Sequence, residues 1–287
     1  MKIIITGSSG FLGKRLYRKL IENKHEIMCY DIINSYDILN IEQLEETIIS
    51  FKPDSIVHLA ACADLNIFAE TPEISYKINV IGTRNILELC QKYNVRLLFA
   101  STCCCYGNNN THPSDETSPT CPTEPYAKSK RESEKDILKI GLPHCCMRLA
   151  TFYGPEMREA LAPAIFIDKA HKNEQILVHG NGEQTRTLTY VDDIVSGIVT
   201  LIENKPKYTI VNITTEEITS VNTIVKIAKD LTNNNIEIKY INDRDGQIYQ
   251  EEIHSRRLQS FGWKWETNFE DGMRKSYNYY LKNNQKW

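Results

Sequence analysis

The chain has 287 residues, of which 41% are hydrophobic and 25% are charged, and its formal net charge is −3. This composition can fill one large hydrophobic core, and the scattered Lys and Arg form no basic stripe of the kind that follows a nucleic-acid backbone. The apolar run in "MKIIITGSSGFLG" is too short for a signal peptide or a membrane span. We therefore expect a soluble, cytoplasmic protein that binds neither nucleic acid nor membranes.

The first half of the chain alternates short apolar runs with longer amphipathic ones. Strands are expected at residues 2–6, 25–31, 54–60, 96–101 and 144–150. The segments between them have helical spacing of apolar residues, at about 11–23, 41–50, 71–93 and 126–139. This alternation predicts an α/β fold with a Rossmann-type, doubly wound parallel sheet and right-handed crossovers.

After residue 150 the alternation of strand and helix is lost. We expect residues 1–150 to form the dinucleotide-binding domain and residues 151–287 to form mainly a smaller, C-terminal substrate-binding annex, with the site in the crevice between them. Helix 219–231 is amphipathic, and its Ile224, Ile227 and Leu231 fit a core face. The long polar loop 107–125 is of the kind that is usually functional or mobile.

Three glycines follow the first predicted strand and open the first predicted helix. In Gly7-x-x-Gly10-x-x-Gly13 the missing side chains let the backbone approach a pyrophosphate, whose charge is met by the helix N-terminus. Asp31 ends the second strand, where a carboxylate accepts hydrogen bonds from a ribose 2'-hydroxyl and repels a 2'-phosphate. The pattern predicts NAD rather than NADP; the alternative is a tight turn with a solvated acid.

A second motif is Tyr126-x-x-x-Lys130 in "EPYAKSK". Residues four apart share one helix face, so the phenol and the ammonium would meet the same ligand. A tyrosine titrates near 10, so acting as a base near neutrality requires its pKa to fall by roughly three units, about 4 kcal/mol. Lys130 and a positively charged nicotinamide are the expected sources. The motif alone is common on solvated helix faces, and it gains weight from the upstream glycines.

Nine cysteines include three adjacent ones in "STCCCYG" (101–107). Structural zinc sites favour C-x-x-C spacing, which is absent from the sequence, and adjacent residues of an extended chain point to opposite faces. We expect reduced thiols that pack as small side chains, and no metal site.

These motifs resemble those of the extended short-chain dehydrogenases/reductases that act on nucleotide sugars, a family of epimerases, dehydratases and 4-keto reductases. The resemblance covers nearly the whole chain and is carried by "TGSSGFLG", "HLAA", "NVIGTRN", "STCCCYG", "YAKSK", "FYGP", "GNGEQTRTLTYVDD" and "FGWKW". It implies NAD as the cofactor, a nucleotide sugar as the substrate, with a UDP-sugar favoured, and a homodimer paired through helices 75–93 and 126–139.

The resemblance also implies roles for individual residues. The catalytic residues would be Thr102, Tyr126 and Lys130. The cofactor would contact Gly7, Gly10, Phe11, Leu12, Gly13, Asp31, Asp37, Ile38, Leu59, Ala60, Ala61 and Asn79, together with Tyr126 and Lys130. The substrate would contact Cys103, Cys104, Thr151 and Arg186, with the forked donors of Arg186 on the diphosphate.

The residues around "STCCCYG" separate the subfamilies. In the 4,6-dehydratases the two residues after the Thr are Asp and Glu, and here they are Cys103 and Cys104, so dehydration is not expected. In the fucose-synthase-like enzymes the partner of such a Cys is a His, and Ala160 stands at that position. Three interpretations remain: a 4-epimerase with a transient 4-keto intermediate, which we favour, a 4-keto reductase, and a catalytically silent subunit.

Overall fold

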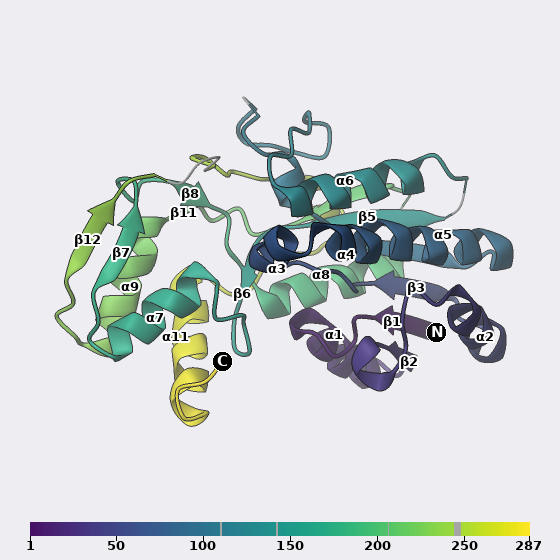
Figure 1. Cartoon of the computed structure of the whole chain (residues 1–287), viewed down its shortest axis with the longest axis horizontal. Helices are drawn as coiled ribbons and strands as arrows, with labels where there is room; N and C mark the ends of the chain where they lie inside the picture. The colour runs from purple at the N-terminus through teal and green to yellow at the C-terminus, as the bar shows by residue number, and fades with distance from the viewer. Residues whose placement is uncertain (110, 142, 206, 244–247) are drawn as a thin grey trace.

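In the computed structural model, described for residues 1–109, 111–141, 143–205, 207–243 and 248–287, six parallel strands form the central sheet (Figure 1). Their order is β10-β5-β4-β3-β1-β2. The strands are β1 (Lys2–Thr6), β2 (Glu26–Tyr30), β3 (Ser55–His58), β4 (Arg96–Thr102), β5 (His144–Leu149) and β10 (Ile210–Ile213). This arrangement confirms the predicted doubly wound parallel fold.

Helices cover both faces of the sheet because side chains alternate along each strand. Ile3 and Ile5 of β1 pack into one core with the apolar sides of α1 and α8, whereas Ile4 packs into the opposite core with α2, α5 and α6. The helices are α1 (Phe11–Glu22), α2 (Ile41–Phe51), α5 (Gly82–Tyr93), α6 (Pro125–Leu138) and α8 (Val191–Asn204). Both α8 and β10 follow residue 150 in sequence, so the C-terminal half contributes to the sheet as well as to the annex.

The segment predicted as one helix over 71–93 is divided in the structure. The extra helix α3 (Leu65–Glu70) precedes it, α4 (Pro72–Tyr76) starts with proline at its first turn, and a π-helical turn η2 (Lys77–Ile81) joins α4 to α5. Proline is tolerated at a helix start because its missing N–H has no partner there. Single π-helical turns often occur at functional sites, and this one carries Asn79.

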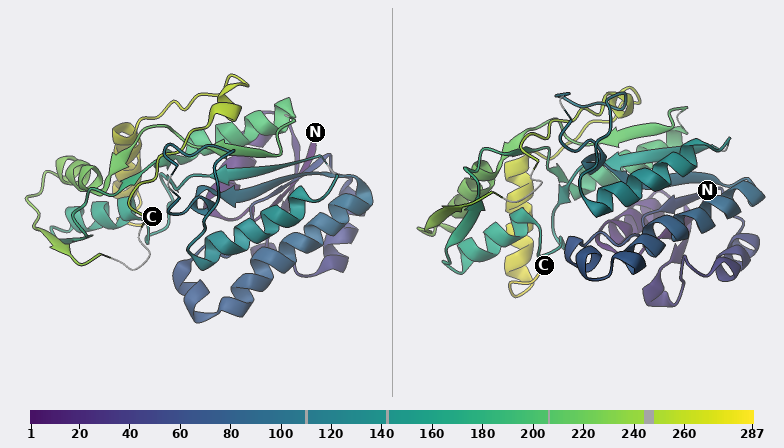
Figure 2. Two further views of the ribbon diagram at one scale, coloured as in Figure 1. Left: turned by 90° about the horizontal axis from the view of Figure 1, so that it is seen from above. Right: turned by 45° about the horizontal axis from the view of Figure 1, so that its top comes forward.

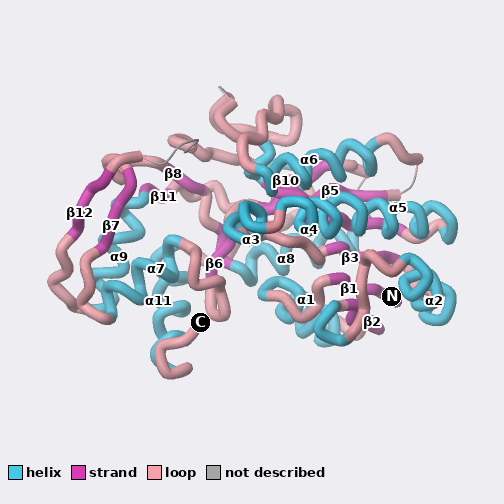
Figure 3. Tube along the Cα trace, viewed as in Figure 1, coloured by secondary structure: helices cyan, strands magenta, loops and turns pink. Residues whose placement is uncertain are grey.

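The annex lies beside the sheet and has its own apolar core (Figures 1 and 2). Figure 3 shows its helices packed against short strand pairs. Its elements are β6 (Phe152–Tyr153), α7 (Ala162–His171), β7 (Ile176–His179), β8 (Thr185–Arg186), β9 (Thr189–Tyr190), β11 (Thr219–Ser220), α9 (Val221–Thr232), β12 (Ile238–Ile241) and α11 (Phe269–Lys282). The short helix α10 (Arg256–Gln259) instead packs against β10 and α8 of the sheet domain. The pairs are β7 with β12, β8 with β11 and β6 with β9.

Helix α9 starts two residues later than predicted because the Ser220 hydroxyl accepts a hydrogen bond from the Thr223 N–H and caps it. Its predicted core face is largely confirmed. Ile224 is buried, and Ile227 and Leu231 are partly buried against the same cluster. Among the described residues no helix is both long and apolar enough to cross a membrane.

Candidate functional site

A cavity of about 570 Å³ opens at the carboxyl edge of the sheet. The chain leaves β1 toward β2 on one side and β3 lies on the other, so this edge is the point where the strand order reverses, the usual ligand site of such sheets. Predicted site residues that line the cavity are Gly7, Gly10, Phe11, Leu12, Gly13, Leu59, Ala61, Thr102, Cys104, Tyr126, Lys130, Thr151 and Arg186.

The glycine turn between β1 and α1 is too tightly packed for side chains. Gly7 has φ +70°, and a Cβ built on it would lie 2.6 Å from the Ala60 nitrogen. A Cβ on Gly13 would lie 2.2 Å from the Gly7 carbonyl oxygen. Gly10 precedes α1 without a side-chain cap, which leaves the first N–H groups of the helix facing the cavity side. These features fit the diphosphate of a dinucleotide.

Asp31 ties the end of β2 to the glycine turn. Its Oδ2 accepts a hydrogen bond from the Ser9 N–H at 2.9 Å, and its Oδ1 accepts one from the Ile33 N–H at 3.0 Å. The second bond caps the short 3-10 helix η1 (Ile32–Asn34). The Asp31 carboxylate therefore stabilises the local backbone at the position where a ribose is expected.

Asp37, Ile38, Ala60 and Asn79 are not among the residues that line the cavity. Ile38 is buried against Gly82, where a Cβ would lie 2.5 Å from its Cδ1. The Asp37 carboxylate accepts a hydrogen bond from the Leu39 N–H. The buried Asn79 amide accepts a bond from the Cys62 N–H and donates to the Cys62 carbonyl and the Ser129 hydroxyl.

Thr102, Tyr126 and Lys130 come together from β4 and α6. Thr102 ends β4, and its hydroxyl accepts a hydrogen bond from the Cys104 N–H, which caps the 3-10 helix η3 (Cys103–Cys105). Lys130 is 1% exposed, and its ammonium lies 4.7 Å from the centre of the Phe99 ring. Burial lowers the pKa of Lys130 to about 7. Burial raises the pKa of Tyr126, Cys104 adds to that rise, and the charge of Arg158 opposes it.

A buried ion pair fixes α6 against the sheet. Arg148 of β5 donates from Nε and Nη2 to the two carboxylate oxygens of Glu134, at 2.9 Å each, and both side chains are at most 2% exposed. Arg148 also donates to the Tyr106 hydroxyl. Since Glu134 lies one turn beyond Lys130 on α6, this bidentate contact sets the position of the helix that presents Tyr126 and Lys130.

Of the three adjacent cysteines, Cys104 alone lines the cavity. The Cys103 thiol donates to the Arg148 carbonyl and packs with Cys105 and Tyr106, so the predicted substrate contact through Cys103 lacks support. The turn of η3 is the reason, because successive side chains of a 3-10 helix point in different directions. Burial raises the pKa of Cys104 to about 12, which keeps its thiol protonated near neutrality. Among the described residues no three His, Cys, Asp or Glu are grouped to hold a metal ion.

Three charged residues that the sequence analysis did not select also line the cavity: Glu124, Arg158 and Glu251. Arg158 donates to the Ala63 carbonyl at 2.9 Å. Glu124 directly precedes "PYAKSK", so that motif could have identified it. Arg158 and Glu251 belong to annex loops in which no sequence motif marks them. The predicted Arg186 donates to the carbonyls of Thr185 and Ile248 at 2.7 and 2.9 Å.

Comparison with known proteins gives matches along almost the whole chain. Residues 3–214 match the model of the NAD dependent epimerase/dehydratase family. A putative UDP-glucose 4-epimerase of Methanocaldococcus jannaschii is 32% identical, covering 99% of both chains. UDP-glucuronic acid decarboxylase 1 of Xenopus tropicalis is 30% identical, covering 98% of this chain and 72% of the relative. Other matching relatives are dTDP-D-glucose 4,6-dehydratases.

Among solved structures, the UDP-glucose 4-epimerase of Thermotoga maritima with UDP-glucose superimposes with a TM-score of 0.90 at 29% identity, covering 99% of both chains. The predicted resemblance is thus confirmed by family, relatives and fold, and the glycine turn fits the cofactor that the family uses. The chain belongs to the NAD-dependent epimerase/dehydratase family, and it is an NAD-dependent enzyme of the extended short-chain dehydrogenases/reductases that act on nucleotide sugars.

Proposed function

We propose that this protein is a nucleotide-sugar 4-epimerase that acts on a UDP-sugar through a transient 4-keto intermediate. The observation that carries the proposal is the joint position of Thr102, Tyr126 and Lys130, which line one cavity together with the glycine turn. The UDP-glucose 4-epimerases among the similar proteins support the same choice.

The cofactor's diphosphate would lie at the N-terminus of α1, held by backbone N–H groups beside Gly10. Asp31 would hold the adenosine ribose, and Lys130 would hold the cofactor's other end. Bound NAD supplies the reversible uptake of a hydride from C4 of the sugar. The buried ion pair between Arg148 and Glu134 keeps Lys130 in place for this contact.

The chain's own residues would move the proton. Thr102 would donate a hydrogen bond to the C4 oxygen, and the Tyr126 phenolate would take the C4 hydroxyl proton as the C4–H bond breaks. Tyr126 would return the proton to the C4 oxygen when the hydride comes back to the opposite face of the ketone. Because burial raises the pKa of Tyr126, its ionisation needs positive charge nearby, from Lys130, Arg158 or the bound cofactor.

The rival proposals differ in what the site must contain. A 4-keto reductase would use the same residues with external NAD(P)H in one direction. A silent subunit would not need Thr102, Tyr126 and Lys130 to line one cavity. We do not favour a 4,6-dehydratase, because Cys103 is turned away from the cavity and Cys104 stays protonated.

We also propose a homodimer paired through α5 and α6.

The deciding experiment is to denature freshly purified protein and to identify and count the released dinucleotide. Near-stoichiometric NAD, followed by interconversion of UDP-glucose and UDP-galactose without added cofactor, is the expected result. Protein that is isolated empty and oxidises added NADPH only with a 4-keto sugar would replace the proposal by the reductase. Absence of any dinucleotide binding would favour the silent subunit.

A further inference from the structure

The wall of the cavity next to Cys104 carries two carboxyl groups. Glu124 and Glu251 both line the cavity, and both act electrostatically on the Cys104 thiol. Glu124 occupies the N-cap position of α6, yet its side chain does not accept a capping hydrogen bond there. Cys104 lies two residues after Thr102, so these carboxyl groups border the place where the reacting sugar would lie.

Glu251 is a buried acid with few partners of its own. It is 7% exposed, and burial raises its pKa, while the charge of Arg186 opposes the rise. Thr187 is the hydrogen-bond partner of its carboxylate among the described residues, through a hydroxyl 3.4 Å away and through its backbone N–H. A carboxylate buried in this way has acceptor capacity left for a ligand that donates.

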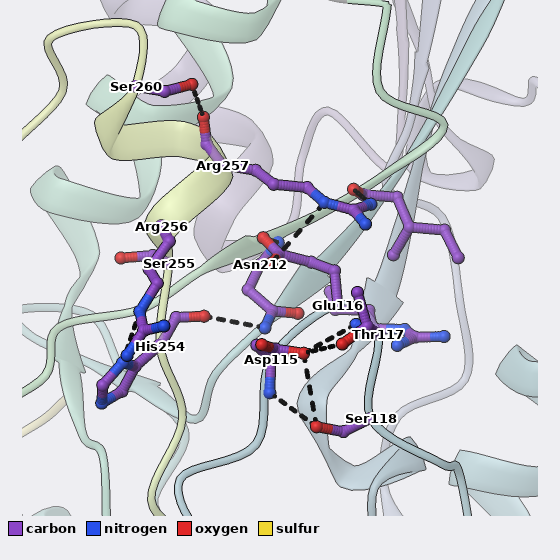
Figure 4. A network of polar contacts seen from close by, with 12 residues as sticks. Asp115, Glu116, Thr117, Ser118, Asn212, His254, Ser255, Arg256, Arg257 and Ser260 are labelled. Atoms are coloured by element: carbon purple, nitrogen blue, oxygen red, sulfur yellow. Dashed lines mark hydrogen bonds and ion pairs between the residues drawn. The ribbon is translucent and has the colours of Figure 1, made fainter.

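The segment that carries Glu251 is firmly held. Residues 114 and 253 form a β-bridge, and the Ser114 N–H donates to the Glu252 carbonyl at 2.8 Å. Figure 4 shows the neighbouring network, in which the Glu116 carboxylate accepts from the Asn212 N–H and pairs with Arg257. The Asn212 amide of β10 also donates to the His254 carbonyl. Because the segment is joined to both the 107–124 loop and β10, moving Glu251 aside for an unsuitable ligand would break these contacts.

Of the three cations on the cavity wall, Lys130 lies over the Phe99 ring and the two arginines donate to backbone carbonyls. The charge of Arg186 lowers the pKa of Glu251, but its guanidinium donates to two backbone carbonyls, and it is the expected partner of the substrate diphosphate. Arg158 donates a hydrogen bond to the Ala63 carbonyl, and its positive charge lowers the pKa of Tyr126. A carboxylate placed next to Cys104 would therefore meet two acidic side chains in a site where screening by water is weak.

We propose that Glu251, assisted by Glu124, makes the site selective for nucleotide sugars that present neutral hydroxyl groups to Cys104, and that it excludes nucleotide uronates. This inference rests on the proposed binding of a UDP-sugar in the cavity. Sugar hydroxyls donate to the free acceptor positions of Glu251, whereas a uronate carboxylate offers no donor and adds repulsion.

The test measures binding rather than turnover, with the NAD-loaded Tyr126→Phe protein, so that catalysis does not change the ligand. Dissociation constants for UDP, UDP-glucose and UDP-glucuronate are measured by calorimetry with and without Glu251→Gln. We expect UDP-glucose to bind at least about tenfold more tightly than UDP-glucuronate, and Glu251→Gln to reduce that ratio to about threefold or less. UDP affinity should change by less than about twofold.

Glu252→Gln is the matched control, since it makes the same charge change one residue along, on a side chain outside this cavity that accepts a bond from Gln250. It should keep the wild-type ratio. Equal or tighter binding of UDP-glucuronate before any change at Glu251 overturns the inference without needing a variant. An equal loss of affinity for all three ligands in Glu251→Gln also overturns it. In that case Glu251 would only offset the positive charge of Arg186. Failure of UDP itself to bind would instead refute the proposed function.

Discussion

At the scale of single residues, the site contains two groups, Tyr126 and Lys130, whose burial disfavours their charged forms. Tyr126 and Lys130 were selected from a four-residue spacing, and the structure adds that Lys130 is almost fully buried over Phe99 without an ion pair among the described residues. Such burial costs stability and is typical of groups retained for function.

The first prediction concerns Tyr126. Tyr126→Phe removes the proton acceptor but keeps the ring that packs edge-on against Phe68, so turnover should fall by about 10²–10⁴-fold while NAD remains bound. Tyr76→Phe is the control, since that exposed hydroxyl contacts Glu132 on the surface. Epimerisation rates and the NAD content of the two variants check the prediction. A Tyr126→Phe enzyme with normal rates would remove Tyr126 from the mechanism.

The second prediction follows from the pKa of Lys130, about 7 in the folded protein and near 10.5 when unfolded. Between these values the unfolded chain binds more protons, so the free energy of unfolding should rise with pH in this window, by at most about 1.4 kcal/mol per pH unit. In cofactor-free Lys130→Met this rise should be absent, and the variant should exceed the wild type in stability most clearly at or below pH 7.

Urea unfolding of both proteins at several values between pH 6.5 and 9 measures this effect. Lys128→Met changes an exposed lysine of the same helix and should leave the pH dependence unchanged. Parallel stability curves for wild type and Lys130→Met would show that Lys130 is ionised normally in the folded protein.

At the scale of elements, the turn before α1 and the seating of α6 decide whether the site forms. The glycine pattern predicted the turn because only glycine allows such close backbone approach. The ion pair that holds α6 was not predicted, since Arg148 and Glu134 are separated by the end of a helix and a strand, and nothing in their spacing indicates contact.

Gly13→Ala should therefore lower both the stability of the protein and its affinity for NAD. Its Cβ would lie 2.2 Å from the Gly7 carbonyl oxygen and 2.7 Å from the Ser8 Cα, so backbone must move. We expect a loss of about 1–3 kcal/mol in stability together with weaker NAD binding. Gly141→Ala, which meets no atom within 4 Å, should change stability by less than about 0.5 kcal/mol. Chemical denaturation and NAD titration test both, and equal effects would contradict the packing argument.

Arg148→Met should leave the Glu134 charge buried with only Arg131 as an ion-pair partner among the described residues. Removal of one member of a buried pair typically costs about 3–5 kcal/mol, and we expect a value near the lower end because Arg131 remains. The exposed pair of Arg274 with Glu270 on α11 provides the control, since Arg274→Met should cost less than about 1 kcal/mol. Similar unfolding free energies for the two variants would show that the buried pair adds little.

At the scale of the whole molecule, the cavity is completed by segments far apart in the chain. The sheet edge supplies the glycine turn, Thr102, Tyr126 and Lys130, whereas the annex and its loops supply Arg158, Arg186 and Glu251. The cofactor side follows from local motifs, and the sugar side depends on how residues 248–254 pack against the 107–124 loop. The relatives that match over almost the full length carry epimerase, decarboxylase and dehydratase names, in keeping with one cofactor site shared by different sugar sites.

The sequence by itself determined the parallel sheet, the glycine turn and the pairing of Tyr126 with Lys130, because hydrophobic periodicity and i, i+4 spacing are local properties of the chain. Tertiary structure decided that β10 completes the sheet from beyond residue 150, that Cys104 rather than Cys103 reaches the cavity, and that Glu251 lies beside it. These features depend on long-range packing and on the burial of charge, which no short stretch of sequence encodes.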